Sequence, residues 1–254
     1  MQESKDIEVK GEIVSATPKK RTINLIVQYY DAPTPERQKE VDTCLENNCK
    51  VQVVDRIYLL NEKKYDLEER HLAHPKITQI VIGERLTFDI GFRFAALNLS
   101  GEICVIANAD IILTETFSVL HQKNLDDALV ALARWNIEKD SKVTINGNTT
   151  GSQDTWIFTP PLPKLYPNGY LTPSPILLQD AAVGSIPVGN AWGCENRLAY
   201  YIQSAGMKLY NPCYNLITLH LHLHDLQRVR GTRYIPQPFA FIQVRPIDEI
   251  PNRK

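Results

Sequence analysis

The sequence lacks the glycine-rich motifs with which common nucleotide-binding domains hold phosphate. Neither GxGxxG nor GxxxxGK followed by Ser or Thr occurs in the 254 residues, which argues against a dinucleotide-dependent dehydrogenase, a P-loop enzyme and a sugar nucleotidyltransferase. The GxSxG motif of α/β-hydrolase nucleophiles is also missing. If the chain binds a nucleotide, a metal ion and cationic side chains must hold the phosphates instead.

Long apolar runs, a dominant charge sign and paired cysteine motifs are missing as well. No apolar run approaches the roughly 18 residues of a membrane-spanning helix, and the polar N-terminus does not resemble a signal peptide. The net charge of −1 gives no bulk attraction to nucleic acid or to an anionic membrane. The five cysteines are odd in number and form no CxxC motif. We therefore expect a reduced, cytoplasmic protein that does not bind nucleic acid.

What the chain does contain is typical of an ordinary globular protein, with 43% hydrophobic and 22% charged residues. Its first 110 residues alternate between apolar runs of β-forming residues and helical patterns. Strands are expected in TINLIVQYY, VVDRIYLLNE, KITQIVIGERLT and EICVIANAD. Helices are expected in PERQKEVDTCLENN, with Thr34-Pro35 as its start, and in DIGFRFAALNLS. In the second helix, Ile90, Phe94 and Leu97 are predicted to line one face. This alternation predicts an α/β fold with a doubly wound, mainly parallel sheet flanked by helices.

The second half has shorter elements and more irregular chain. ALVALARWNI and SQDTWIF are predicted strands, and residues 160–190 form a segment rich in Pro and Gly. WGCENRLAYYIQSAG predicts a helix with Leu198, Tyr201 and Ile202 on one side and Gly206 as its C-terminal stop. MKLYNPCYNLITLHLHLHD predicts two short strands. No linker divides the chain, so a single domain over residues 1–254 is expected.

Polar residues mark the end of the fourth predicted strand, at Asn108-Ala109-Asp110. Residues i and i+2 of a strand share a face, so Asn108 and Asp110 are predicted to point the same way at the carboxyl edge of the sheet. Ligands bind at that edge in open α/β sheets, and a carboxylate there can hold a divalent cation. The alternative is a strand that simply ends in a turn.

Histidine and leucine alternate strictly in His220-Leu221-His222-Leu223-His224. As a strand, this run would place three imidazoles on one face. A neutral imidazole is a good ligand for a divalent transition metal. The alternative is a half-exposed strand with a polar face.

The order of these motifs resembles glycosyltransferases of the GT-A fold, especially the large family-two group and the β-1,4-galactosyltransferases. Asn108-Ala109-Asp110 resembles their DXD motif with Asn in the first place. Trp192-Gly193-Cys194-Glu195 resembles their acidic-pair motif at the start of a helix, with Cys194 in place of the first acid. His220 follows Gly206 by fourteen residues, close to the offset of the metal-binding histidine in the family. The resemblance extends over residues 22–224.

The resemblance implies a Rossmann-like GT-A fold and transfer of a sugar from a nucleotide-sugar donor to the hydroxyl group of a glycan or other acceptor. It implies an Mn²⁺ or Mg²⁺ ion that binds the donor diphosphate and inversion at the anomeric carbon. Residues 1–115 would form the nucleotide-binding half, residues 116–225 the acceptor-binding and catalytic half, and residues 226–254 a C-terminal tail.

The same resemblance suggests individual roles. Asp110 and His220 are the expected metal ligands, with His222 as the alternative histidine. Glu195 is the expected catalytic base, and Asp154 is its rival. The expected donor-binding residues lie at strand ends or carry a positive charge: Gln28, Tyr29, Asn61, Arg85, Asn108 and Asp110, with Arg228 or Arg230 as further candidates for the diphosphate.

Two other functions account for part of the pattern. A zinc metallohydrolase would use His220, His222 and His224 but leaves Asn108 and Asp110 without a role. A non-catalytic binder of nucleotide sugar or glycan would explain why Asn108 and Cys194 replace acidic residues. The donor sugar, the acceptor and the oligomeric state are open at this level.

Overall fold

The computed structural model describes residues 20–138, 140–177, 185–189, 191–221 and 235–253. Its centre is a seven-stranded sheet with the strand order β10-β6-β9-β4-β1-β2-β3. The strands are β1 (Ile23–Val27), β2 (Arg56–Asn61), β3 (Ile77–Val81), β4 (Ile103–Ala107), β6 (Ala128–Leu132), β9 (Thr155–Phe158) and β10 (Lys208–Tyr210). The strands β1 to β4 are parallel, β10 is parallel to β6, and β9 runs antiparallel to both β4 and β6. The predicted mainly parallel α/β sheet is therefore confirmed.

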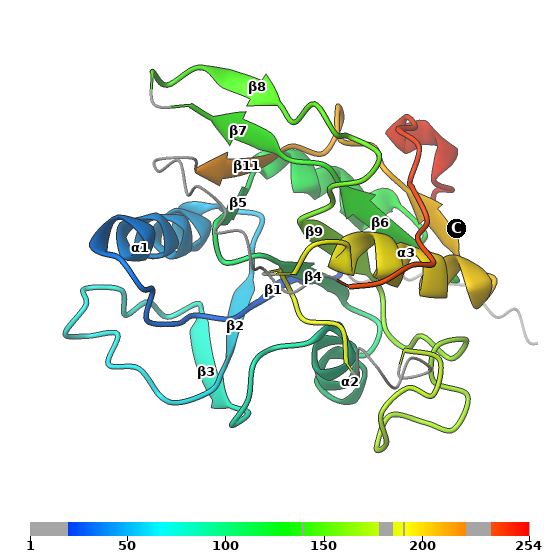
Figure 1. Ribbon diagram of the computed structural model, residues 1–254, viewed down its shortest axis with the longest axis horizontal. Helices are drawn as coiled ribbons and strands as arrows, with labels where there is room; N and C mark the ends of the chain where they lie inside the picture. Colours follow the sequence, from blue (N-terminus) through cyan, green and yellow to red (C-terminus); the bar gives the residue numbers. More distant parts are fainter. Residues whose placement is uncertain (1–19, 139, 178–184, 190, 222–234, 254) are drawn as a thin grey trace, which may run out of the picture.

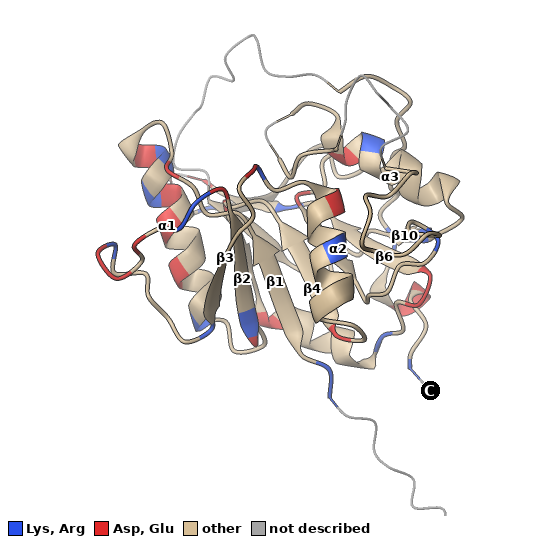
Figure 2. Cartoon of the chain, turned by 90° about the horizontal axis from the view of Figure 1, so that it is seen from below, with Lys and Arg blue, Asp and Glu red and all other residues tan. Residues whose placement is uncertain are grey.

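Helices cover both faces of this sheet (Figure 1). Helix α1 (Pro35–Lys50) packs on one face, and α2 (Phe88–Asn98) and α3 (Cys194–Ser204) pack on the other. The side chains of β1 alternate between two hydrophobic clusters: Leu25 packs on the side of α1, and Ile26 on the side of α2 and α3. Charged residues are frequent along α1, whereas the central strands carry few (Figure 2). Burial on both faces explains why these strands are continuous apolar runs.

Local capping sets where the first two helices begin. The hydroxyl oxygen of Thr34 accepts a hydrogen bond from the backbone N–H of Arg37, and Pro35 occupies the first turn, as predicted for the start of α1. Of the three residues predicted to line one face of α2, Ile90 and Phe94 pack partly buried against the core, but Leu97 does not. Phe88, Phe92 and Ala95 are buried, whereas Leu97 is 56% exposed.

Close packing of α2 on β4 explains this difference. A Cβ atom at Gly91 would lie 2.7 Å from the Cδ1 atom of Ile106. The helix therefore turns its glycine side toward the sheet, and the residues on that side are buried. Ile90 and Phe94 remain only partly buried as a result.

A second, four-stranded sheet has the order β5-β11-β7-β8. It consists of β5 (Ile111–Leu113), β7 (Trp135–Ile137), β8 (Val143–Ile145) and β11 (Thr218–Leu221). The predicted strand ALVALARWNI is in fact two strands, because the chain leaves the main sheet after β6 and enters the second sheet as β7. Two short 3-10 helices, η1 (Glu115–Gln122) and η2 (Ile247–Glu249), complete the described elements.

The C-terminal elements agree with their predicted patterns. In α3, Leu198, Tyr201 and Ile202 are buried, and Gly206 ends the helix with a φ of 74°. Along β11, Thr218 and His220 are buried. His222, His224, Arg228 and Arg230 lie outside the described residues. No helix in the described part of the chain is both long and apolar enough to cross a membrane.

Candidate active site

The candidate site lies at the carboxyl edge of the parallel strands. Gln28 follows β1, Asn61 ends β2, and Asn108 follows β4. Because β9 is antiparallel to β4, with Thr155 opposite Ala107, Asp154 enters the sheet at this same edge. Ligands of open α/β sheets bind at this edge because the loops there connect strands to elements on opposite faces.

Asn108-Ala109-Asp110 forms a turn, which was the alternative interpretation of this motif. Strand β4 ends at Ala107, and the carbonyl oxygen of Asn108 accepts a hydrogen bond from the backbone N–H of Ile111 at 3.2 Å. The chain passes here from the main sheet into β5 of the second sheet. The prediction that Asn108 and Asp110 share a strand face is therefore wrong. The two side chains enter different networks.

Asp110 contacts two cationic or potentially cationic groups. Its Oδ2 atom lies 2.7 Å from a guanidinium nitrogen of Arg37 and 3.2 Å from Nε2 of His220. Strand pairing brings the histidine there: β11 is antiparallel to β5, with His220 opposite Ile111, and the N–H of Leu221 donates to the carbonyl oxygen of Asp110 at 3.4 Å. The second sheet thus joins the predicted metal ligands, Asp110 and His220.

The surroundings of Asp110 keep its side chain charged. Burial raises the pKa of Asp110, but His220 and Arg37 act more strongly and hold the pKa well below the usual range of a carboxyl group. The Oδ1 atom is buried and has no hydrogen-bond partner among the described residues. A buried, charged carboxylate with one unused oxygen and a neighbouring imidazole fits a divalent cation such as Mn²⁺, which accepts oxygen and nitrogen ligands. No three His, Cys, Asp or Glu residues of the described ranges form a metal-binding cluster by themselves.

Arg37 was not predicted from the sequence. It lies in the first turn of α1, where the helix dipole disfavours a cation. Its guanidinium group also contacts Glu40 at 2.7 Å and the hydroxyl group of Tyr30 at 3.3 Å. Burial lowers the pKa of Arg37, but Asp110, Tyr30 and Glu40 together raise it above its usual value. The sequence feature that could have identified Arg37 is its place at the start of a helix. A cation there needs a negatively charged partner to offset the helix dipole.

Asp154 lies in the second network of the site. Its Oδ1 atom accepts a hydrogen bond from Nδ2 of Asn108 at 2.7 Å, and its Oδ2 atom lies 2.6 Å from a guanidinium nitrogen of Arg134. Arg134 follows β6 and was also missed by the sequence patterns. Its side chain is partly buried, and its Nε donates to Asn136 at 3.1 Å. Both carboxylate oxygens of Asp154 are thus held by donors from neighbouring strands.

Glu195 lies in the first turn of α3, as predicted. The preceding Gly193 has a φ of 83°, and a Cβ atom there would lie 2.6 Å from Cζ of Phe239. Only glycine allows this backbone to turn so close to the C-terminal segment. Arg197 donates to the carbonyl oxygen of Pro238 at 3.2 Å and fixes the same segment on the helix.

The side chain of Glu195 is only partly exposed. Burial and, after it, the charge of Asp154 raise the pKa of Glu195 to about 7, against lowering contributions from Cys194 and Arg134. The site therefore holds two acids in opposite states: Asp110 is charged, and Glu195 exchanges its proton near neutral pH.

The residues predicted to bind the nucleobase and ribose of the donor lie at the ends of β1 and β2, and each of them also has contacts within the protein. Gln28 accepts from the N–H of Leu86 at 3.2 Å. The side-chain oxygen of Asn61 accepts from the N–H of Tyr29 at 2.9 Å. The ring of Tyr29 is buried, and its hydroxyl donates to Asp42 at 2.6 Å. The structure thus places Gln28 and Asn61 at the site edge, with Tyr29 directed toward α1.

Arg85 lies on the loop between β3 and α2. Its guanidinium group donates to the carbonyl oxygen of Val188 at 3.3 Å. The segment around Val188 also reaches the site, since a Cβ atom at Gly189 would lie 2.9 Å from Oδ1 of Asn108. Arg85 and Asn108 are therefore linked through residues 188–189.

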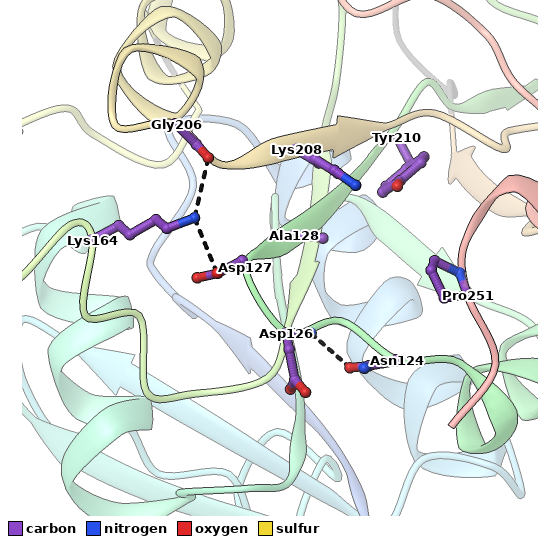
Figure 3. A pocket seen from close by; sticks show the side chains of 9 residues that line it. All are labelled: Asn124, Asp126, Asp127, Ala128, Lys164, Gly206, Lys208, Tyr210 and Pro251. Carbon is purple, nitrogen blue, oxygen red and sulfur yellow. Dashed lines mark hydrogen bonds and ion pairs between the residues drawn. The ribbon is translucent and has the colours of Figure 1, made fainter. Parts of the chain in front are cut away.

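Two hollows on the surface lie apart from these acids. One, of about 490 Å³, lies between α1 and residues 70–72. The other, of about 290 Å³, lies at the amino end of β6, where Lys164 bridges the carbonyl oxygen of Gly206 and the carboxylate of Asp127 (Figure 3). Asp110, Asp154 and Glu195 line neither hollow. The candidate site is thus defined by its converging side chains.

Comparison with known proteins identifies no family. No family model matches the sequence, and no curated protein matches it. The mannosyltransferase PcManGT from Pyrobaculum calidifontis, solved in complex with GDP-Man and Mn²⁺, is similar with a TM-score of 0.46 and 14% identity over 83% of this chain and 59% of that chain. A 4-diphosphocytidyl-2C-methyl-D-erythritol synthase has a TM-score of 0.41 and 14% identity over 84% of this chain and 97% of that chain.

HddC from Yersinia pseudotuberculosis is a further similar structure. It has a TM-score of 0.34 and 16% identity over 54% of this chain and 76% of that chain. Similarities this weak assign neither a substrate nor a residue role.

Proposed function

We propose that this chain is an inverting glycosyltransferase that moves a sugar from a nucleotide-sugar donor to an acceptor hydroxyl group. The observation that supports this most is the pair of acids with opposite behaviour at the carboxyl edge of the sheet. Asp110 is held charged beside His220, whereas the pKa of Glu195 is raised to about 7. Environments that separate two acids in this way are typical of sites that combine charge stabilisation with proton transfer.

Asp110 and His220 would hold the divalent cation, with His222 as the alternative histidine, and the donor diphosphate would complete the site. Mn²⁺ suits this mixed oxygen and nitrogen set better than Mg²⁺, which prefers oxygen. When bound, such an ion neutralises the charge of the diphosphate leaving group. Arg37 lies on the other side of Asp110, where it balances the charge of the carboxylate and shares its Oδ2 atom with the proposed ion.

Glu195 would act as the base. The acceptor O–H bond breaks as Glu195 takes its proton, a bond forms between the acceptor oxygen and the anomeric carbon, and the bond to the donor phosphate oxygen breaks with its electron pair on the diphosphate. One displacement of this kind inverts the anomeric carbon. A base with a pKa of about 7 is well matched to this transfer at neutral pH.

Asp154 is the less suitable base. A general base needs an oxygen that can approach the acceptor hydroxyl, and both oxygens of Asp154 already accept from Asn108 and Arg134. We therefore assign the proton transfer to Glu195. We propose that Gln28, Asn61 and Tyr29 contact the nucleobase and ribose of the donor. Arg85 and Asn108 are further proposed contacts to the donor.

The test is a thermal-shift screen of UDP-, GDP- and dTDP-sugars with and without Mn²⁺, followed by a turnover assay with the stabilising donor. A ligand at a hundredfold excess over its Kd adds about 2.7 kcal/mol of stability. We expect stabilisation that needs both nucleotide and Mn²⁺, together with slow release of sugar from the donor. Stabilisation without any turnover would favour a non-catalytic binder, and zinc that survives dialysis would favour a metallohydrolase.

A further inference from the structure

Asn108 and Asp154 form a cross-strand pair at the centre of the site. The Nδ2 atom of Asn108 donates to Oδ1 of Asp154 at 2.7 Å, and the backbone N–H of Asn108 donates to the carbonyl oxygen of Asp154 at 3.1 Å. A carboxylate only accepts hydrogen bonds, so the amide nitrogen of Asn108 must face it. Asp154 therefore sets the orientation of the Asn108 side chain.

Arg134 is the third member of this network. It holds the second oxygen of Asp154 at 2.6 Å, and its own Nε donates to Asn136. Hydrogen bonds with one charged partner are shorter and stronger than those between neutral groups. Asp154 is therefore a fixed charge, oriented from two sides by neighbouring segments of the sheet.

An amide at position 108 is the group that this arrangement requires. A carboxylate there would place two acceptors of like charge against each other at the 2.7 Å separation of the present hydrogen bond. Like charges at a shared, partly buried site disfavour each other strongly. The absence of an acid at position 108 thus follows from the presence of one at position 154.

We propose that Asn108 and Arg134 hold Asp154 as a positioning residue whose fixed negative charge keeps Glu195 able to accept a proton from the acceptor. This role rests on the proposed function of Glu195. Burial is the largest cause of the raised pKa of Glu195, and the charge of Asp154 is the next. Cys194 and Arg134 lower the pKa. In this arrangement Asn108 serves the proton-transfer side of the site, and Asp110 serves the metal side.

A charge-swap series tests the proposal: Asn108→Asp, Asp154→Asn and the double variant. Asn108→Asp should lower kcat at least tenfold, because two carboxylates then face each other. The double variant should recover most of that loss, since Asn at 154 can donate to Asp at 108 and still accept from Arg134. Asn98→Asp is the matched control, because it adds the same charge on the exposed end of α2.

The pH profile separates positioning from a merely structural role. Asp154→Asn removes a negative charge that raises the pKa of Glu195, so the acidic limb of kcat/KM should move to lower pH. An unmoved limb, or a double variant no more active than Asn108→Asp, would overturn the proposal.

Failure of the proposed function would look different. In that case the wild-type protein would show no turnover with any donor, while a double-mutant cycle on unfolding free energy would still report whether positions 108 and 154 interact. Turnover that survives in Glu195→Gln would likewise refute the base assignment and with it the positioning role of Asp154.

Discussion

The Nε2 atom of His220 lies 3.2 Å from Oδ2 of Asp110, although 110 residues separate them in the chain. The two meet because β11 pairs with β5 directly after the turn that contains Asp110. The same carboxylate binds Arg37 from α1. Three elements from different parts of the chain therefore meet at one carboxylate.

Asp110→Asn tests whether this carboxylate binds the metal. The substitution keeps the size of the side chain and removes its charge. We expect the affinity for nucleoside diphosphate in Mn²⁺ to fall at least tenfold, about 1.4 kcal/mol, with circular dichroism unchanged. Asp126→Asn, on an exposed loop at the opposite edge of the sheet, is the control. Unchanged nucleotide affinity in Mn²⁺ would show that Asp110 is not a ligand.

Arg37→Met removes the cation that shares Asp110 with the proposed metal. Without the guanidinium group, Oδ2 of Asp110 keeps only its contact with His220. Mn²⁺ alone should therefore bind about tenfold more tightly, about 1.4 kcal/mol, as measured by calorimetry. The variant should also lose on the order of 3 kcal/mol of stability, because a buried charge loses its partner. Lys39→Met, on the exposed side of α1, should change neither quantity. Weaker Mn²⁺ binding in Arg37→Met would mean that Arg37 helps to form the metal site.

Glu195→Gln tests the base. It is nearly isosteric and cannot take a proton, so kcat should fall by a factor of about 10² or more, with donor affinity little changed. In the wild-type enzyme only the deprotonated form is active. Because the pKa of Glu195 is raised to about 7, kcat/KM should drop about tenfold for each pH unit below 7. A flat profile between pH 5 and 7 would argue against Glu195 as the base.

The same substitution should stabilise the protein at alkaline pH. The folded pKa of Glu195 lies above its value of 4.5 in the unfolded chain, so the native state binds the extra proton and loses stability as pH rises from 4.5 to about 7. Glu195→Gln removes that loss, a gain on the order of 2 kcal/mol at pH 8 that disappears at pH 4. Denaturant unfolding at both pH values measures it. An equal gain at both would indicate a packing effect.

Gly193→Ala tests how the start of α3 is positioned. The new Cβ atom would strain a backbone with a φ of 83° and contact Phe239, so we expect a loss of about 2–4 kcal/mol in stability together with a lower kcat. Gly206→Ala is the matched control. Its φ is 74°, but a Cβ atom there meets no neighbour within 4 Å. It should cost about 1 kcal/mol and leave kcat unchanged.

Several features of this protein are determined by the sequence alone. The four parallel strands, the helix start at Thr34 and the stop at Gly206 all appear in local patterns of apolar, capping and turn residues. Such patterns depend on neighbours a few residues apart, so they are visible without the fold. For the same reason Asp110, Asp154 and Glu195 were recognisable as polar residues at the ends of elements.

The partners of these residues were decided only by the tertiary structure. Arg37 reaches Asp110 over 73 positions, and Asn108 reaches Asp154 over 46. These contacts depend on the order and direction of strands in two sheets, which no local pattern contains. The buried face of α2 was set in the same way, by the close contact of Gly91 with Ile106 on β4. Packing between distant segments therefore brings these polar residues together into a site with one acid whose pKa is lowered and one whose pKa is raised.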